Sequence, residues 1–377
     1  MTASDVYEKL ARHLSTLGMG YPPTETLIEI LEENFNPVEA EVALTLPTKV
    51  IPLEPVPVKE IIAKAGLPEE TLQNILEELS NKGLIFCGRT EKGEKGYALQ
   101  QMGFSFPQTF FWRGEETPHS KNMAVLIAKY FNRKVTSEAY SSETDAYRYV
   151  PTSGTVDAGI QAVYPHHTME SVLENVTDFA VCHCSCRMIA QLRGRPCEHP
   201  TEVCIKFDEM ARYVIDRELG RKITQEEALE LIKQSEDAGL VHFVDNAKGK
   251  IKHNCNCCGC ACWNVGAIKR RKIPRDILMA TYFIRETDED ECTGCGECTE
   301  LCPVNAVVMQ NDLPWIDREW CIGCGVCVSK CPTGAAKLII RPDKTGDLPA
   351  WDFEELHGMI LDEKLAGGFS GSSDNKS

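Results

Sequence analysis

Two copies of one cysteine pattern decide how the C-terminal third of this chain folds. Residues 292–303 read CTGCGECTELCP, and residues 321–332 read CIGCGVCVSKCP. Every cysteine of the first run recurs twenty-nine positions later in the second. Each run spaces three cysteines by two residues and adds a fourth, followed by proline, after three more. This spacing predicts iron–sulfur ligation, because zinc ribbons separate their cysteines into two distant pairs.

The duplicated run resembles the two-cluster bacterial ferredoxin family over residues 283–341 and keeps all eight cysteines and both prolines. The resemblance implies two [4Fe-4S] clusters. Three neighbouring thiolates wrap one cluster, while the fourth lies where the chain leads away and therefore ligates the other. One cluster is expected on Cys292, Cys295, Cys298 and Cys331, and the second on Cys302, Cys321, Cys324 and Cys327.

Glycines stand between the cysteines of both runs, at positions 294, 296, 323 and 325. Backbone without a side chain can approach an inorganic cluster closely and point amide donors at its sulfurs. We therefore expect these glycines to line the two clusters.

Ten further cysteines lie between residues 182 and 262, which is too many for core packing and indicates ligation of a soft metal or cluster. Eight of them would complete two more [4Fe-4S] clusters, four would complete one, and a tetrahedral zinc site would also need four. The spacing leaves this number open. The candidate ligands are Cys182, Cys184, Cys186, Cys197, Cys204, Cys255, Cys257, Cys258, Cys260 and Cys262.

The segments CHCSCR at 182–187 and CNCCGCAC at 255–262 resemble a group of multi-cluster iron–sulfur proteins of anaerobic microbes. In that group a CxCR segment, two spaced cysteines and a CNCC-rich segment precede a two-cluster ferredoxin module. The resemblance implies one or two additional [4Fe-4S] clusters. We expect at least one on Cys184 or Cys186, Cys197, Cys204 and members of the 255–262 group. His183 and His199 are expected to lie outside the ligand set.

The N-terminal part contains one cysteine, Cys87, and reads as helix, turn, helix and hairpin over residues 58–100. Apolar periodicity predicts helices over 58–65 and 69–81 and strands near 84–86 and 97–99. This order resembles a winged-helix domain. Its second helix carries Glu69, Glu70, Glu77 and Glu78, which disfavours DNA phosphates and favours a packing or partner-docking role. Arg89, Lys92 and Lys95 in the wing keep DNA binding open.

The whole chain has 377 residues, with 56 acidic against 40 basic side chains and a formal charge of −16. This balance makes nucleic acid an unlikely partner. No apolar run is long enough to span a bilayer, and the N-terminus lacks the pattern of a secretion signal. Free thiols in such number then favour a reducing cytoplasm.

These observations predict an α+β protein of several domains. We expect a winged-helix-like domain over 1–110, a mixed cysteine-rich domain over 111–275, a two-[4Fe-4S] ferredoxin domain over 276–345, and a short helix with a disordered tail over 346–377.

Nucleotide-binding and nucleophile-elbow patterns are absent from the sequence, so we expect an electron-relay component of a larger anaerobic oxidoreductase system that meets protein redox partners. Two alternatives stay open. One is a redox-sensing winged-helix regulator, and the other is a reductase acting at an upstream cluster. Whether the chain has a substrate site of its own stays open too.

Overall fold

The computed structural model describes residues 3–104, 106–277 and 279–367. Helices and short strands alternate along this chain, so the mixed α+β class is confirmed. The expected disordered tail falls largely on 368–377, outside the described residues.

Capping side chains fix where the first helices begin. Thr24 accepts a hydrogen bond from the backbone amide of Leu27, and Asn36 accepts from the amides of Val38 and Glu39. The Glu39 carboxylate accepts in turn from the Asn36 amide and completes a capping box. The N-terminal helices are α1 Ala3–Leu14, α2 Glu25–Asn34, α3 Pro37–Ala43, α4 Val58–Ala65 and α5 Glu69–Asn81.

Helices α4 and α5 have the bounds that the apolar periodicity predicts, and Gly66 ends α4 in the left-handed conformation. A three-stranded antiparallel sheet of order β1-β3-β2 follows, built from β1 Val56–Pro57, β2 Ile85–Arg89 and β3 Lys95–Leu99. The predicted hairpin is therefore present. Its strands are longer than expected, because β2 continues to Arg89 and β3 begins at Lys95.

The centre of the molecule is a six-stranded antiparallel sheet of order β4-β8-β10-β6-β5-β7. Its strands are β4 Tyr147–Val150, β5 Phe179–His183, β6 Glu202–Phe207, β7 Arg221–Ile223, β8 Val241–Asp245 and β10 His253–Cys257. The helices of this part of the chain are α6 Pro118–Tyr130, α7 Arg133–Ala139, α8 Ala158–Val163, α9 Met169–Leu173, α10 Ser185–Leu192, α11 Asp208–Asp216, α12 Gln225–Asp237 and α13 Val265–Lys269. Short 3₁₀ turns are η1 Gln108–Phe111, η2 Pro165–His167, η3 Arg275–Ile277 and η4 Pro342–Lys344.

Strand alternation places asparagine amides on one face of β10 and cysteine thiols on the other. Asn254 and Asn256 turn to one face, where Asn256 donates to the Val203 carbonyl and to the Asn254 side chain. Cys255 and Cys257 therefore turn to the other face. The ladder pairs Asn254 with Ile205 of β6, so the cysteines of β6 and β10 meet at one end of the sheet.

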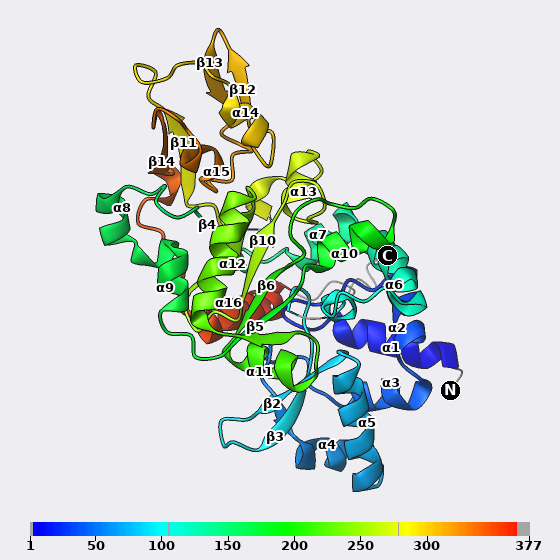
Figure 1. Ribbon diagram of the computed structural model, residues 1–377. Coiled ribbons are helices and arrows are strands. Elements are labelled where there is room, and N and C mark those ends of the chain that lie inside the picture. The colour runs from blue at the N-terminus through cyan, green and yellow to red at the C-terminus, as the bar shows by residue number, and fades with distance from the viewer. Residues whose placement is uncertain (1–2, 105, 278, 368–377) are drawn as a thin grey trace.

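The duplicated cysteine runs form a small module that projects from the body of the molecule (Figure 1). Two antiparallel pairs build it, β11 Phe283–Thr287 with β14 Ala336–Ile340 and β12 Val307–Gln310 with β13 Leu313–Ile316. Its helices are α14 Glu297–Leu301 and α15 Val326–Ser329. The chain then returns to the body, where β15 Ala350–Asp352 pairs in parallel with β9 Ala247–Gly249 and α16 Phe353–Gly367 follows.

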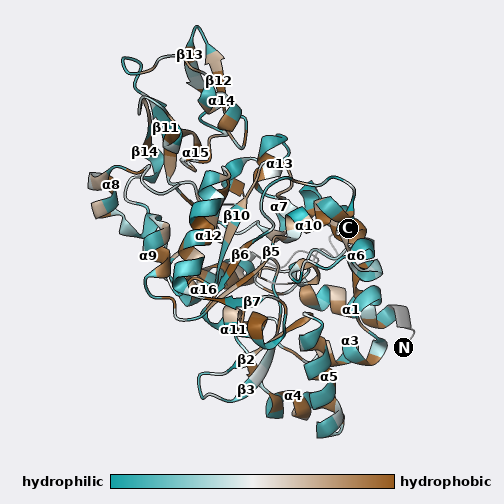
Figure 2. Cartoon of the chain, viewed as in Figure 1, coloured by the Kyte–Doolittle hydropathy of each residue, from teal (hydrophilic) through white to brown (hydrophobic). Residues whose placement is uncertain are grey.

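One hydrophobic cluster runs from α1 to α16 and joins the N-terminal helices to the central sheet. At its middle, the ring of Phe104 contacts the rings of His253, Phe353 and His357. Amphipathic helices such as α5 and α12 turn their apolar residues towards such clusters and their polar residues outwards (Figure 2). The apolar core therefore crosses the boundary expected at residue 110.

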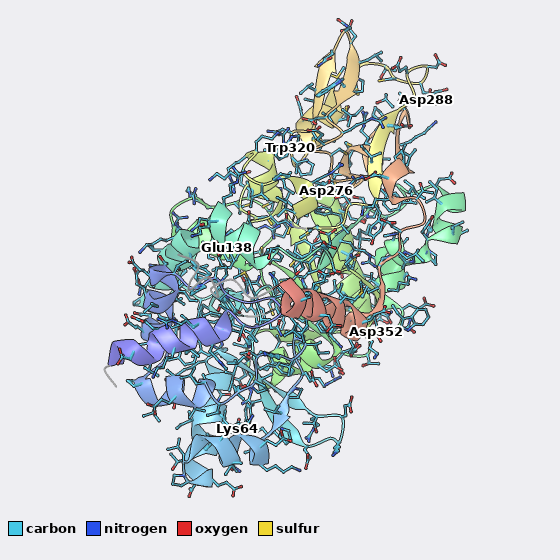
Figure 3. The ribbon with its side chains drawn as sticks, turned by 180° about the vertical axis from the view of Figure 1, so that it is seen from behind. Lys64, Glu138, Asp276, Asp288, Trp320 and Asp352 are labelled. Atoms are coloured by element: carbon cyan, nitrogen blue, oxygen red, sulfur yellow. The ribbon has the colours of Figure 1, made fainter. Side chains whose placement is uncertain are left out.

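Arginines fasten the projecting module to the body. Arg271 donates to the carbonyls of Val304 and Asn305, and its guanidinium lies 4.4 Å from the ring centroid of Trp320. Asp276, which pairs with Arg341 at 2.8 Å, lies with Trp320 at the base of the module, whereas Lys64 marks the opposite end of the molecule (Figure 3). Within the described ranges, no helix is both long and apolar enough to cross a bilayer.

Candidate cluster and metal centres

Six of the ten upstream cysteines line one cavity of about 100 Å³. The void is much larger than the space that a single water needs, about 10–15 Å³. Each thiol interacts with the next around its wall, and Tyr140, Tyr147 and Trp263 are among the other lining residues. We call this the six-thiol cavity, and its cysteines are Cys184, Cys186, Cys204, Cys255, Cys257 and Cys262.

Two buried cations stand beside the six-thiol cavity. Lys206 is fully buried over the Trp112 ring, and Arg187 is 1% exposed. Burial alone would lower the pKa of Lys206, but the sulfurs of Cys204 and Cys255 outweigh it and raise the pKa above its ordinary value. For both cations the charges that raise the pKa come from cysteine sulfurs, and Lys206 Nζ and Arg187 Nε have no hydrogen-bond partner within the described residues.

The chemistry of the donor set explains these cations. A buried ammonium or guanidinium is costly unless an opposite charge lies nearby. Neutral thiols supply no such charge, whereas thiolates bound to a cluster do. The cavity, its six sulfurs and its two cations therefore fit an anionic cluster of thiolate-ligated iron.

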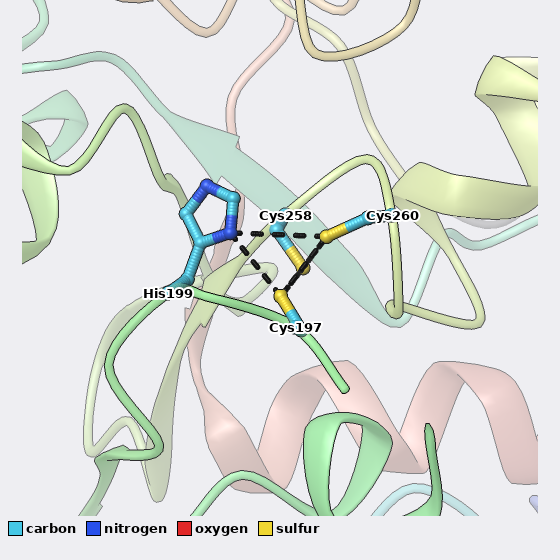
Figure 4. A group of neighbouring side chains, drawn as sticks. All are labelled: Cys197, His199, Cys258 and Cys260. Carbon is cyan, nitrogen blue, oxygen red and sulfur yellow. Dashed lines mark hydrogen bonds between the residues drawn. The ribbon is translucent and has the colours of Figure 1, made fainter. Parts of the chain in front are cut away.

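A second group of donors includes Cys258, which also interacts with Arg187. Cys197 Sγ is 3.2 Å from Nδ1 of His199, 3.0 Å from Cys260 Sγ and 3.7 Å from Cys258 Sγ (Figure 4). Cys258 and Cys260 follow the end of β10 at Cys257 and do not line the cavity that Cys257 lines. We call these four residues the Cys197 group, and all of their donor atoms lie within 4.8 Å of one another.

In the projecting module, a small cavity is lined by Cys292, Cys295 and Cys298 of the first run together with Cys331 of the second. Cys295 is exposed and the other three are partly exposed. The geometry therefore brings together the four cysteines that the expected crossing assigns to one cluster.

The remaining four cysteines of the module are all buried, and they are Cys302, Cys321, Cys324 and Cys327. Burial raises the pKa of Cys327 to about 12, and the neighbouring sulfurs of Cys321 and Cys302 add to the increase. Such thiols ionise at neutral pH only beside a strong positive charge, which the irons of a cluster supply.

The backbone of the module also has the conformation that wrapping a cluster requires. Gly323 has φ +61°, and a Cβ at this position would lie 2.2 Å from the carbonyl oxygen of Phe283. At Gly294 a Cβ would lie 2.7 Å from the Asp312 carbonyl. These two glycines are therefore required by protein backbone beside them as well as by any cluster in front of them.

Comparison with known proteins agrees with this geometry. Residues 291–336 match the 4Fe-4S dicluster domain family. This segment of the chain is therefore a ferredoxin module with two [4Fe-4S] clusters, and we call it the dicluster domain.

A similar protein is a subunit of the ion-translocating oxidoreductase complex of Methanosarcina acetivorans, which is 38% identical over 75 residues. The match covers 20% of this chain and 28% of that protein. No solved structure gives a significant match to the chain. The comparisons support an electron-transfer role and leave the upstream cysteines without a matched family.

The structure arranges the upstream cysteines differently from the grouping expected from sequence. Cys197 does not join Cys184, Cys186 and Cys204 but lies with the 258 and 260 thiols. Cys182 lines neither site, although it pairs with Cys204 across β5 and β6, and it is 1% exposed. His199 was expected to lie outside any ligand set, yet its Nδ1 is in contact with Cys197. His183 contacts Gly114 and the Trp112 carbonyl.

Sequence reasoning missed Arg187 and Lys206 as parts of the site. Arg187 belongs to the CxCR segment, so its place beside the cysteines was the available signal. Lys206 lies two residues after Cys204 on a strand, and strand alternation puts both side chains on one face.

Proposed function

We propose that this chain is an electron-relay component of a larger oxidoreductase system, with a third [4Fe-4S] cluster in the six-thiol cavity. The observation that carries the proposal is the pair of buried cations, Arg187 and Lys206, which face sulfur instead of carboxylate. Four of the six cavity thiols would ligate the cluster, and the remaining two would stay near it. When bound, such a cluster takes up and releases one electron.

In the dicluster domain we propose the crossed ligand sets. The outer cluster would be held by the three cysteines of the first run and Cys331, and the inner cluster by those of the second run and Cys302. Cys292 of the first run and Cys331 of the second line the same cavity, which supports this assignment. The four cysteines of the inner set are all buried, which supports it as well.

Side chains connect the three centres in a line. Arg285 lies close enough to both Cys298 and Cys327 to lower their thiol pKa values, against the increase caused by burial. Tyr149, which is 2% exposed, interacts with Cys257 and Cys262 of the cavity and with Cys324 of the inner cluster. The backbone amide of Thr152 donates to the Cys324 carbonyl at 3.0 Å. Exposure falls along this line from Cys295 inwards, so we propose that electrons enter or leave at the outer cluster.

Two features favour a relay over the alternatives. Six thiols around the cavity suffice to ligate every iron of a cubane, so a substrate-binding iron is not required. The acidic helix α5 is engaged within the chain, because Arg217 pairs with Glu77 at 2.7 Å and donates to Asn81. A helix held in this way is poorly placed to enter a DNA groove.

Residues 56–99 would serve as a winged-helix-like docking unit. The order β1, α4, α5, β2 and β3 supports this interpretation, and Tyr213 donates to the Ile85 carbonyl to hold the unit on the body. The partial similarity to a subunit of an oxidoreductase complex supports protein partners.

The test is metal analysis of the full chain purified anaerobically. We expect about twelve irons and twelve sulfides per chain, four of each for every cubane. A triple variant with Cys204→Ala, Cys255→Ala and Cys257→Ala leaves three thiols in the six-thiol cavity, one fewer than a cubane needs, so it should lower both counts by about four. The matched control Cys87→Ala, in β2, should leave them unchanged. Eight irons in the wild-type chain, or no loss in the triple variant, would refute the third cluster.

A further inference from the structure

We propose that the Cys197 group binds a single Zn²⁺ ion, separate from every iron–sulfur cluster of the chain. Its donors are three sulfurs and one imidazole nitrogen, a common set for tetrahedral structural zinc. This proposal does not depend on the proposed electron-relay function.

The spacing of the donors decides how many metal ions they share. The three Sγ atoms of the Cys197 group lie 3.0, 3.1 and 3.7 Å apart. Sulfurs bonded to one tetrahedral zinc at about 2.3 Å stand about 3.8 Å apart. The four thiolates of a cubane each bind a different iron, so they must stand much further apart. The Cys197 group is therefore compact enough for one ion and too compact for a cubane.

A disulfide does not explain the spacing either. Bonded sulfurs are about 2.05 Å apart, and the Cys258 and Cys260 sulfurs are 3.1 Å apart on residues separated by one position. Three thiols and an imidazole this close, with no bond between them, would be crowded without a shared ion.

Arg187 supplies the charge and the anchorage that such a site needs. Three thiolates, one neutral imidazole and Zn²⁺ carry one net negative charge, and the buried guanidinium lies beside Cys258. Arg187 also donates to the Pro200 carbonyl at 2.6 Å and to the Asn256 carbonyl at 2.7 Å. It thus ties together the two segments that carry the donors.

The remaining surroundings fit a closed structural site. The amide of Ala261 donates to Cys258 Sγ at 3.4 Å, as amides do around bound thiolates. Arg270 donates to the Cys260 carbonyl and holds the outer, exposed ligand in place. With four protein donors no position is left for a substrate, so the ion would fasten the loop around Cys197 to the loop after β10.

The experiment uses the full holoprotein, purified anaerobically, with zinc, iron and sulfide measured on the same sample. We expect about one zinc per chain, and zinc-edge X-ray absorption should show three sulfurs at about 2.3 Å and one nitrogen at about 2.0–2.1 Å. Cys260→Ser should lose the zinc and keep the iron and sulfide counts. Cys87→Ser is the matched control and should keep all three.

His199→Cys guards against a variant that fails to fold. It should retain one zinc per chain and change the absorption signature to four sulfurs, because the added thiol replaces the imidazole. Three outcomes would each overturn the proposal. They are a wild-type chain without zinc, a mononuclear iron in place of the zinc, and a loss of about four irons and four sulfides in Cys260→Ser.

Discussion

At the scale of single residues, the most informative side chains are those whose charge has no ordinary partner. Lys206 and Arg187 are buried where sulfur is the nearest source of negative charge. Their cost in an empty apolar site would be several kcal/mol each, so they belong with thiolates that stay ionised.

Removing one of these charges should shift a reduction potential. In Lys206→Met the reduced, more negative cluster in the six-thiol cavity loses a stabilising cation. Its potential should therefore fall by about 50–100 mV, the size of an interaction of about 1–2 kcal/mol. Redox titration followed by electron paramagnetic resonance would measure the shift. Lys206→Arg keeps the charge and should stay within about 20 mV of wild type. An equal fall in both variants would assign the effect to packing.

A second residue predicts how stability depends on pH. Burial lowers the pKa of His357 to about 4, with Asp245 opposing and His253 adding to the decrease, and His357 Nε2 has no hydrogen-bond partner. The unfolded chain binds a proton near pH 6.5, so the neutral folded form loses stability as the pH falls below that value.

The measurement compares His357→Leu with wild type in anaerobic urea unfolding between pH 7.5 and 5.5. The destabilisation of wild type relative to the variant should grow by about 1 kcal/mol over this interval. His119→Gln, on an exposed ring, is the control and should follow wild type. A difference that is constant with pH would contradict a neutral buried His357.

At the scale of elements, sequence periodicity predicted features that depend on neighbouring residues. It did not predict which cysteines from distant segments come together. The bounds of α4 and α5 and the duplicated runs follow from neighbouring residues. The division of the upstream cysteines does not, because it depends on which face of β10 each one takes and on Cys197, about sixty positions earlier in the chain, reaching Cys258. His199 likewise meets Cys260 only through the folding of two distant loops.

The loops of the dicluster domain allow a matched test of backbone geometry. Gly323 and Gly334 both have positive φ, but a Cβ would strike the Phe283 carbonyl only at Gly323, since nothing lies within 4 Å at Gly334. Gly334→Ala should cost about 1 kcal/mol of unfolding free energy from its backbone conformation alone. Gly323→Ala should cost at least about 3 kcal/mol and lower the iron content. Equal effects on thermal unfolding would show that the contact is unimportant.

At the scale of the whole molecule, the three proposed cluster centres run from an exposed tip to a buried cavity. Figure 1 shows the dicluster domain standing out from the body, where a partner can reach it. Cys295 is exposed at the outer centre, while the cysteines of the inner centre are buried. A protein partner should therefore exchange electrons with the chain at the tip. If that partner is a donor, the cavity cluster should receive its electron through the dicluster domain.

Cys295→Ser tests this direction of transfer, because Cys295 lines only the outer cavity. The variant should lack the outer cluster, so a donor must reach a centre further from the surface. With a reduced two-[4Fe-4S] ferredoxin as donor, stopped-flow reduction of the cavity cluster should therefore slow by at least about tenfold. With dithionite, a small diffusible reductant, the rate should change much less. Cys87→Ser provides the control with both donors. If the ferredoxin reduces the variant as fast as wild type, electrons enter the body directly and the projecting domain is an exit.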